Sequence, residues 1–199
     1  YPCLFYMIGV AETTNKAVLS ITTPTLELDL QACRLAKEVD AKVLTVAKGA
    51  HFTAFHREVL EDNPALEVAI RGEYELTIQE IAQGLPLGEI AGLTWRRNGR
   101  VWVNPTRPFI EDLDRIPFPA RHLLRNQDYI RPDTGEMQTT IQANRGCPSR
   151  CIFCLAPQVS GRKVRSRSPG NIADEMGLCV ERFGIHSVLF EFSHRDGNA

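Results

Sequence analysis

Strand-length runs of apolar residues recur through the first third of the chain. They lie at positions 16–22, 41–47 and 68–71. Pro24 and Gly49 follow the first two runs, and neither residue type continues a strand well, since proline lacks a ladder donor and glycine has no side chain to pack. Short apolar runs bounded in this way predict strands that are buried on both faces, as in a parallel sheet.

The segments between these runs carry their apolar side chains at helical spacing. Residues 26–40 predict a helix with Thr25 as its N-cap. Its apolar positions are Leu28, Ala32, Leu35, Ala36 and Val39. Shorter helices are predicted at 56–61 and 75–83, the second ended by Gly84. Alternating strands and helices predict an α/β fold with a doubly wound, Rossmann-like parallel sheet.

Two further patterns follow the predicted sheet. Strand-like flanks surround Asn98-Gly99 within 93–103, which predicts a β-hairpin. Residues 105–138 open with four prolines and predict an extended connector whose apolar side chains lie along a domain surface. The prolines are Pro105, Pro108, Pro117 and Pro119, and the apolar residues among them are Phe109, Leu113, Ile116 and Phe118. We therefore expect one domain at 1–104, a proline-rich linker at 105–138 and a second domain at 139–199.

The second domain begins with a strand, a loop, a helix and a strand. Residues 139–144 predict the first strand, and Ser168-Pro169 predicts a helix start, because proline fits the first turn of a helix. This helix ends at Gly184, and another strand is predicted at 187–192. The apolar face of the helix is made of Ile172, Met176, Cys179, Val180 and Phe183. This order matches the opening of a (β/α) barrel or sheet.

Composition narrows the class of protein but not its chemistry. Hydrophobic residues make up 43% and charged residues 24% of the 199 positions, which is ordinary for a globular protein. The net charge of −1 gives no argument for nucleic acid, and the longest apolar runs are too short to span a bilayer. The opening segment lacks the pattern of a signal peptide. Because the chain opens on tyrosine, we expect it to be a piece of a longer protein.

Three of the six cysteines crowd into residues 147–154, within RGCPSRCIFC. Their C-x3-C-x2-C spacing is too tight for structural disulfides, and the scattered Cys3, Cys33 and Cys179 suit a reducing cytoplasm. Thiolates bind zinc or iron–sulfur clusters. Structural zinc needs four ligands, and no second cysteine pair or nearby histidine supplies them. Cys179 could be the distant fourth ligand of a ferredoxin-like site, but its place on an apolar helix face favours a buried core cysteine.

Cys147, Cys151 and Cys154 therefore predict a cluster with three protein ligands and one open iron. The pattern C-x3-C-x-aromatic-C after a strand, with Phe153 before the last cysteine, resembles the signature of the radical S-adenosylmethionine (radical SAM) superfamily. The resemblance implies a 4Fe-4S cluster on the three cysteines, S-adenosyl-L-methionine on the open iron and Phe153 beside its adenine. It also implies reductive cleavage of S-adenosylmethionine to a radical that abstracts hydrogen from the substrate.

Motifs in the rest of the chain resemble radical SAM enzymes that carry a cobalamin (B12)-binding domain before the barrel. In order, they are S-x-T-T-P-T at 20–25, G-A-H at 49–51, R-G-E-Y-E at 71–75, E-D-L-D-R-I-P-F-P-A-R at 111–121 and R-S-R-S-P at 165–169. The resemblance implies a partial Rossmann-like cobalamin-binding domain followed by the start of a partial (β/α) radical SAM barrel. The residues it places against cobalamin are Ser20, Thr22, Gly49, Ala50 and His51.

Two stretches depart from the family's pattern. Its Asp-x-His-x-x-Gly motif, which supplies an axial histidine to cobalamin, is not formed by the 19 residues before Ser20. Its acidic F-x-D-D-x-F-like stretch reads FEFS at 190–193.

The segment between 145 and 167 contains six basic residues and no acidic residue, which suits a dianionic cluster or a carboxylate-bearing cofactor. The basic residues are Arg145, Arg150, Arg162, Lys163, Arg165 and Arg167.

The predicted function is that of a radical SAM enzyme that performs cobalamin-dependent methyl transfer or a related radical modification. The expected partners are a small-molecule substrate and an external electron donor such as flavodoxin or ferredoxin, with no nucleic acid and no membrane span. The alternatives are a non-catalytic iron–sulfur or zinc binding module and a methylthiotransferase-type radical SAM enzyme. The chain alone is expected to be inactive, because too few barrel strands are present to enclose a radical.

Overall fold

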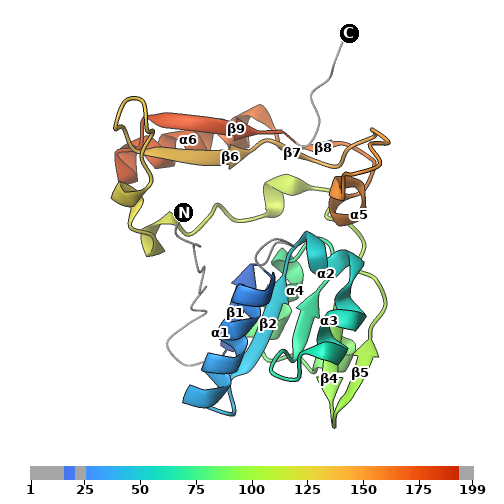
Figure 1. The fold of residues 1–199 in the computed structure, drawn as a ribbon. Coiled ribbons are helices and arrows are strands. Elements are labelled where there is room, and N and C mark those ends of the chain that lie inside the picture. The colour runs from blue at the N-terminus through green and yellow to red at the C-terminus, as the bar shows by residue number, and fades with distance from the viewer. Residues whose placement is uncertain (1–15, 21–25, 193–199) are drawn as a thin grey trace. The chain divides into compact units, whose positions relative to one another are not determined.

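The computed structural model describes residues 16–20 and 26–192. The chain divides into two compact units, the first ending at Phe109 and the second beginning at Ile110 (Figure 1). Each unit has its own sheet structure. The proline-rich segment that we predicted as a linker is divided between the two units.

The first unit is built on a five-stranded sheet in the order β1-β2-β3-β4-β5. β1 (Lys16–Ser20), β2 (Leu44–Lys48) and β3 (Val68–Ile70) are parallel neighbours. β4 (Leu93–Arg97) and β5 (Arg100–Val103) extend the sheet with antiparallel pairing. The predicted parallel sheet is confirmed, although β2 begins three residues later than expected, and the hairpin makes the whole sheet mixed.

Four α-helices alternate with these strands in the described part of the first unit. They are α1 (Leu26–Val39), α2 (Ala50–Ala54), α3 (His56–Asp62) and α4 (Glu75–Ala82). A short 3-10 helix, η2 (Leu87–Glu89), precedes β4. The helices at 56–61 and 75–83 were predicted, whereas α2 was not, since its five residues are too few to show a period.

Two hydrophobic cores lie on the two faces of the sheet. Side chains alternate between faces along a strand, so Ala47 and Ala69 join one core while Val46 and Val68 join the other. Residues of α1, α2 and α3 complete the first core, and Ile81 of α4 belongs to the second. Helices therefore pack on both faces, which confirms the doubly wound arrangement.

The buried face of α1 differs from the predicted one. Leu28, Leu35 and Val39 are 49%, 59% and 88% exposed, while Leu30 and Cys33 enter the core with 2% and 1% exposure. Both sets recur at helical spacing, so periodicity alone does not choose between them. Contact with the strands and with α3 decides which stripe is buried. The predicted cap, residue 25, lies outside the described residues.

The turn between β4 and β5 is the predicted Asn98-Gly99 hairpin. Asn98 and Gly99 have positive φ angles of 52° and 74°. A type I′ turn requires positive φ at both central residues, and asparagine and glycine tolerate it best. The local sequence was therefore sufficient to specify this element.

The second unit has two separate strand pairs among its described residues. β6 (Gln138–Gln142) and β9 (Ser187–Glu191) are parallel, whereas β7 (Asn144–Arg145) and β8 (Arg165–Ser166) are antiparallel. The single strand predicted at 139–144 is thus divided, because its last residues leave β9 and bond β8 instead. Three 3-10 turns precede β6: η3 (Leu113–Arg115), η4 (Arg121–Leu123) and η5 (Asn126–Asp128).

α6 (Pro169–Phe183) connects β8 to β9, and the short α5 (Ala156–Ser160) lies between β7 and β8. α6 begins and ends as predicted. The Ser168 hydroxyl accepts from the Asn171 amide at 3.1 Å, and Gly184 adopts the left-handed conformation with a φ of 64°. In neither unit does a described helix have the length and apolar character needed to cross a membrane.

Candidate functional site

The three clustered cysteines lie on one loop, residues 146–164, which we call the cysteine loop. Its base is closed by the β7–β8 ladder and by a hydrogen bond from the Cys147 amide to the Gly161 carbonyl at 3.0 Å. The Arg165 side chain, 5% exposed, donates to the Ser160 carbonyl at 2.6 Å. The base of the cysteine loop is therefore fixed by backbone and side-chain bonds.

Gly146 lies where the backbones at the two ends of the cysteine loop approach each other closely. Its φ is +88°, and a Cβ added there would lie 2.0 Å from the Lys163 carbonyl oxygen and 2.8 Å from its carbon. A side chain at this position would overlap the opposite backbone, because real contacts are longer than 3 Å. Glycine therefore permits the close approach of the two ends of the cysteine loop directly before Cys147.

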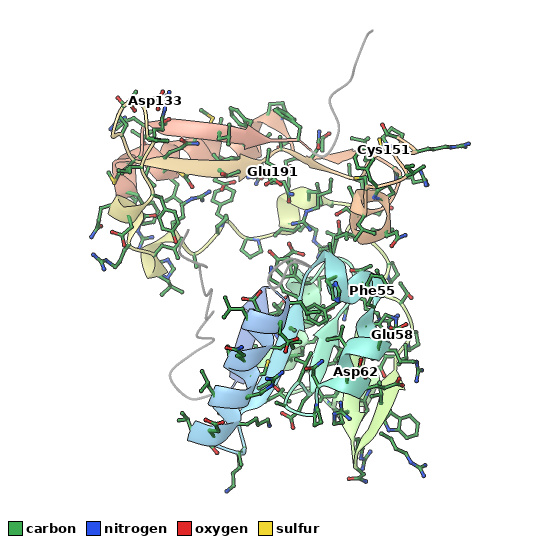
Figure 2. The ribbon with its side chains drawn as sticks, in the orientation of Figure 1. Phe55, Glu58, Asp62, Asp133, Cys151 and Glu191 are labelled. Atoms are coloured by element: carbon green, nitrogen blue, oxygen red, sulfur yellow. The ribbon has the colours of Figure 1, made fainter. Side chains whose placement is uncertain are left out.

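The thiols differ in exposure. Cys147 is 8% exposed, whereas Cys151, labelled in Figure 2, and Cys154 are exposed. Across residues 16–20 and 26–192, no three His, Cys, Asp or Glu side chains lie close enough together to hold a metal ion. The fold thus gathers the cysteines on one loop without bringing their thiols together, and their role as ligands stays a prediction. Phe153, predicted beside S-adenosylmethionine, is 87% exposed on the same loop.

Cys179 is a core residue, as predicted. It is fully buried on α6, and burial raises the pKa of its thiol. Metals bind the thiolate rather than the thiol, so a buried thiol with a raised pKa makes a poor ligand. The ferredoxin-like alternative, which needs a fourth cysteine, gains no support from this environment.

Most of the basic side chains between 145 and 167 make contacts that shape the second unit. Arg150 is exposed on the cysteine loop. The other five basic residues each have a hydrogen-bond partner: Gln142 for Arg145, the Ser149 carbonyl for Arg162, Glu111 for Lys163, the Ile110 and Ser160 carbonyls for Arg165, and Glu175 for Arg167. The positive charge that we expected to attract an anionic cluster is therefore largely engaged within the fold.

The residues predicted to bind cobalamin lie at the carboxyl edge of the first sheet. Ser20 ends β1 and Gly49 follows β2, and these strands are parallel neighbours. Ala50 and His51 open α2 at the same edge, and Thr22 lies outside the described residues. The two strand ends are therefore neighbours at this edge, while contact of these residues with cobalamin stays a prediction.

His51 is enclosed by aromatic rings. It is 7% exposed, and its ring centroid lies 5.8 Å from that of Phe52 and 5.2 Å from that of Phe55. Burial lowers the pKa of the imidazole, which favours the neutral ring at neutral pH. A neutral imidazole can donate from one nitrogen and accept at the other.

Two residues of the R-G-E-Y-E motif stand at this edge without having been predicted as site residues. Glu73 is only 6% exposed despite its charge. The Lys48 ammonium, at the end of β2, lies 3.8 Å from the Tyr74 ring centroid, a cation–π contact. The motif itself was the signal, since it follows β3 in the same way that Gly49 follows β2. Charged or polar groups thus lie at the end of β2 and directly after β3.

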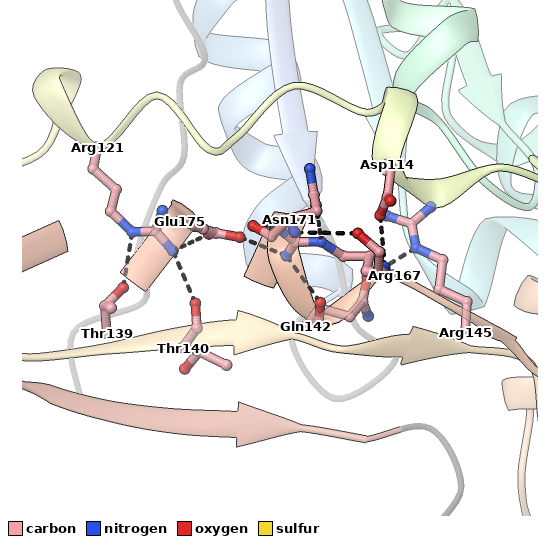
Figure 3. Close-up of polar contacts among 10 residues, drawn as sticks. Asp114, Arg121, Thr139, Thr140, Gln142, Arg145, Arg167, Asn171 and Glu175 are labelled. Atoms are coloured by element: carbon pink, nitrogen blue, oxygen red, sulfur yellow. Dashed lines mark hydrogen bonds and ion pairs between the residues drawn. The ribbon is translucent and has the colours of Figure 1, made fainter. Parts of the chain in front are cut away.

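A buried ion network in the second unit was also missed by the sequence analysis. Glu175 of α6 pairs with Arg121 and Arg167, which belong to the two motifs quoted at 111–121 and 165–169 (Figure 3). Helical spacing assigns the buried face of α6 to apolar residues, and nothing in that pattern predicts a buried carboxylate. Only the pairing across segments accounts for it.

Comparison with known proteins shows what this chain is similar to. No protein-family model matches the chain. An uncharacterized methyltransferase of Pyrococcus horikoshii is 30% identical over 188 residues, covering 92% of this chain and 39% of that protein. The anaerobic magnesium-protoporphyrin IX monomethyl ester cyclase of Rubrivivax gelatinosus is 29% identical over 171 residues, covering 82% of this chain and 30% of that protein. The cobalamin-dependent radical SAM methyltransferase TokK of Streptomyces tokunonensis is 25% identical over 185 residues, covering 83% of this chain and 27% of that protein.

Over most of its length the chain is similar to enzymes that include a cobalamin-dependent radical SAM methyltransferase. A solved structure of the radical SAM methyltransferase TsrM from Kitasatospora setae, with cobalamin and a 4Fe-4S cluster bound, matches 94% of this chain and 39% of that one. The TM-score is 0.66 at 16% identity, which shows a shared fold. The chain spans less than half the length of each of these relatives.

Proposed function

We propose that this chain is part of a cobalamin-dependent radical SAM methyltransferase. Cys147, Cys151 and Cys154 hold a 4Fe-4S cluster, S-adenosylmethionine binds at the open iron, and cobalamin binds beyond the ends of β1, β2 and β3. The observation that carries the proposal is the cysteine loop, with three thiols within eight residues, which follows β7 and lies shortly after β6, a strand of a parallel pair. When bound, such a cluster supplies the electron that cleaves S-adenosylmethionine.

The residues of the cysteine loop fit such a cluster in chemistry and placement. Thiolate sulfur is the ligand that iron–sulfur clusters require, and three cysteines leave one iron open. Cys147 is held at the base of the loop by its amide bond to Gly161. Cys151 and Cys154 are exposed, so their thiols can turn toward Cys147 without breaking that base. Phe153 supplies an aromatic face between them for the adenine ring.

The carboxyl edge of the first sheet supports the cobalamin part of the proposal. Cofactors of doubly wound sheets bind beyond the carboxyl ends of the strands. Gly49, with a φ of 133°, gives the backbone no side chain where a cofactor would approach. Neutral His51 offers hydrogen bonds without adding charge at this edge.

Iron uptake by cysteine variants tests the proposal. After anaerobic reconstitution, Cys151→Ala is expected to bind little iron, because one of three ligands is missing, while Cys179→Ala binds as much as the unchanged chain. Iron and sulfide per chain are measured together with the absorbance near about 400 nm that thiolate-bound iron gives. Equal loss in both variants would make Cys179 a ligand. Uptake of zinc without colour would favour the zinc module.

Ring formation is a second candidate reaction. Similarity to the magnesium-protoporphyrin IX monomethyl ester cyclase favours it. The two reactions leave different products, because methyl transfer from S-adenosylmethionine leaves S-adenosylhomocysteine, whereas radical formation alone leaves 5′-deoxyadenosine and methionine. Chromatography of the products of the whole enzyme separates them. S-adenosylhomocysteine formed along with a methylated product is the result expected for a methyltransferase.

The proposal extends to partners and location. The substrate is a small molecule, as tryptophan is for TsrM. An external donor such as flavodoxin or ferredoxin supplies the electron that reductive cleavage consumes. All cysteines among the described residues are free, which suits a reducing compartment such as the cytoplasm.

A further inference from the structure

Glu175 lies in the middle of α6 with 1% of its side chain exposed, and each of its oxygens meets an arginine (Figure 3). Oε1 lies 2.7 Å from Nη2 of Arg121, and Oε2 lies 2.5 Å from Nη1 of Arg167. Arg121 opens η4, and Arg167 stands between β8 and α6. One carboxylate therefore joins three segments of the second unit.

The same two arginines hold the strand that leads into the cysteine loop. Arg121 donates from Nε to Thr139 Oγ1 and from Nη2 to the Thr140 carbonyl, both at 3.0 Å. Arg167 donates from Nη1 to the Gln142 carbonyl at 3.1 Å. All three acceptors belong to β6, which ends at Gln142. The network thus fixes the end of β6 shortly before the first cysteine.

The chemistry of the network favours a role in geometry over a role in stability. Burying a carboxylate and guanidinium groups costs several kcal/mol of desolvation, so apolar residues of the same volume would often stabilise as well or better. Two arginines also exceed one glutamate in charge, and Nη1 of Arg121 is buried with no hydrogen-bond partner in the described part of the chain. The planar fork of a guanidinium, however, accepts only one arrangement of its acceptors.

We propose that Glu175 is a positioning residue for the cysteine loop. It orients Arg121 and Arg167, and through them the end of β6, so that Cys147 meets the cluster in one geometry. The constraint continues along the chain, because the Gln142 side chain accepts from Arg145 Nε at 2.8 Å, directly before Gly146. This inference rests on the proposed function, in which Cys147 is a cluster ligand.

Glu175→Gln tests the inference, with Glu181→Gln at an exposed position of α6 as the matched control. The variants and the unchanged chain are reconstituted anaerobically and challenged with excess iron chelator at a temperature where circular dichroism shows them folded. We expect Glu175→Gln to lose iron about tenfold faster, the size of effect found for residues that orient metal ligands. The EPR signal of its reduced cluster is expected to broaden, and Glu181→Gln to match the unchanged chain.

A variant that keeps the packing separates positioning from stability. In the triple variant Arg121→Met, Arg167→Met, Glu175→Leu, apolar side chains fill the volume of the network, so the melting temperature is not expected to fall. Faster iron loss and a broadened signal are expected to remain. If Glu175→Gln does not fold, Arg167→Lys, which keeps the charge but not the fork, takes its place in the comparison.

Two results would overturn the positioning role. One is iron retention and an EPR signal equal to those of the unchanged chain in a folded variant of Glu175, Arg121 or Arg167. The other is faster iron loss confined to variants whose melting temperature falls. If the unchanged chain itself takes up no iron, the proposed function fails before any variant is compared, so the two failures are distinguishable.

Discussion

At the scale of single residues, Gly146 determines whether the cysteine loop can close. Gly146→Ala would place a methyl group 2.0 Å from the Lys163 carbonyl oxygen, at a φ of +88° that alanine rarely adopts. We expect the free energy of unfolding of the second unit to fall by about 2 kcal/mol or more, and iron uptake to fall with it. Thermal unfolding and iron analysis after reconstitution measure the two effects.

Gly135→Ala is the control for backbone strain alone. Gly135 has a similar φ of +73°, but a Cβ there would meet no atom within 4 Å. Gly135→Ala should lower the free energy of unfolding by about 1 kcal/mol and leave iron uptake unchanged. Equal effects in the two variants would show that the close contact at Gly146 does not matter.

His56 gives the first unit a dependence on pH. Its Nδ1 lies 2.8 Å from Thr94 Oγ1, and burial, with a smaller effect of Arg71, lowers its pKa from the usual 6.5. The unfolded chain therefore binds a proton more readily than the native one, so stability falls as the pH drops below about 6.5. We expect His56→Gln to reduce this slope in urea unfolding followed between about pH 5 and 7.5.

The partner of His56 supplies the contrast. Thr94→Val removes the same hydrogen bond but keeps the imidazole, so it should lower stability at every pH and preserve the slope. His51, whose pKa is also lowered by burial, keeps part of the slope in both variants. If the free energy of unfolding of His56→Gln depends on pH as strongly as that of the unchanged chain, His56 is not a cause of the dependence.

At the scale of elements, Asn104 fastens the β4–β5 hairpin to the segment before it. Its Nδ2 donates to the carbonyls of Leu87 at 2.6 Å and Ile90 at 2.7 Å, and its Oδ1 accepts from the Trp95 indole at 2.9 Å. Asn104→Ala removes all three hydrogen bonds and leaves their partly buried partner groups unpaired with this side chain. We expect the free energy of unfolding to fall by about 2–3 kcal/mol. Urea unfolding followed by tryptophan fluorescence measures it.

Asn63 is the matched comparison in the same unit. Its Nδ2 makes one hydrogen bond, to the Val59 carbonyl at 2.9 Å. Asn63→Ala should therefore cost only about 1 kcal/mol. A loss at Asn104 no larger than the loss at Asn63 would mean that the three bonds of Asn104 add nothing to the hairpin.

At the scale of the whole molecule, the described part of the second unit holds one parallel strand pair, β6 and β9. A radical must be enclosed to avoid quenching, and two strands do not enclose a cavity. We expect these 199 residues to take up iron but to show no multiple turnover of S-adenosylmethionine with dithionite. Chromatography for 5′-deoxyadenosine measures this, and repeated turnover coupled to a modified product would contradict it.

Several features of this protein followed from its sequence alone, because their signals are local. The Asn98-Gly99 turn and the caps of α6 depend on neighbouring residues, and the structure has them where predicted. The ligand chemistry of the cysteine loop is also local, since three thiols within eight residues need no distant partner. The order of the motifs indicated a resemblance to cobalamin-binding radical SAM enzymes, and the relatives include a cobalamin-dependent radical SAM methyltransferase.

Other features were decided only by the tertiary structure, because they depend on contacts between distant segments. Two apolar stripes of α1 were equally periodic, and packing on the sheet chose the one with Leu30 and Cys33. The basic residues near the cysteines suggested an anion site, but most of them bond carbonyls and carboxylates elsewhere in the unit. Glu175 is buried because Arg121 and Arg167, from two other segments, meet it there. A buried charge needs such partners, and no local pattern in the sequence reveals where they come from.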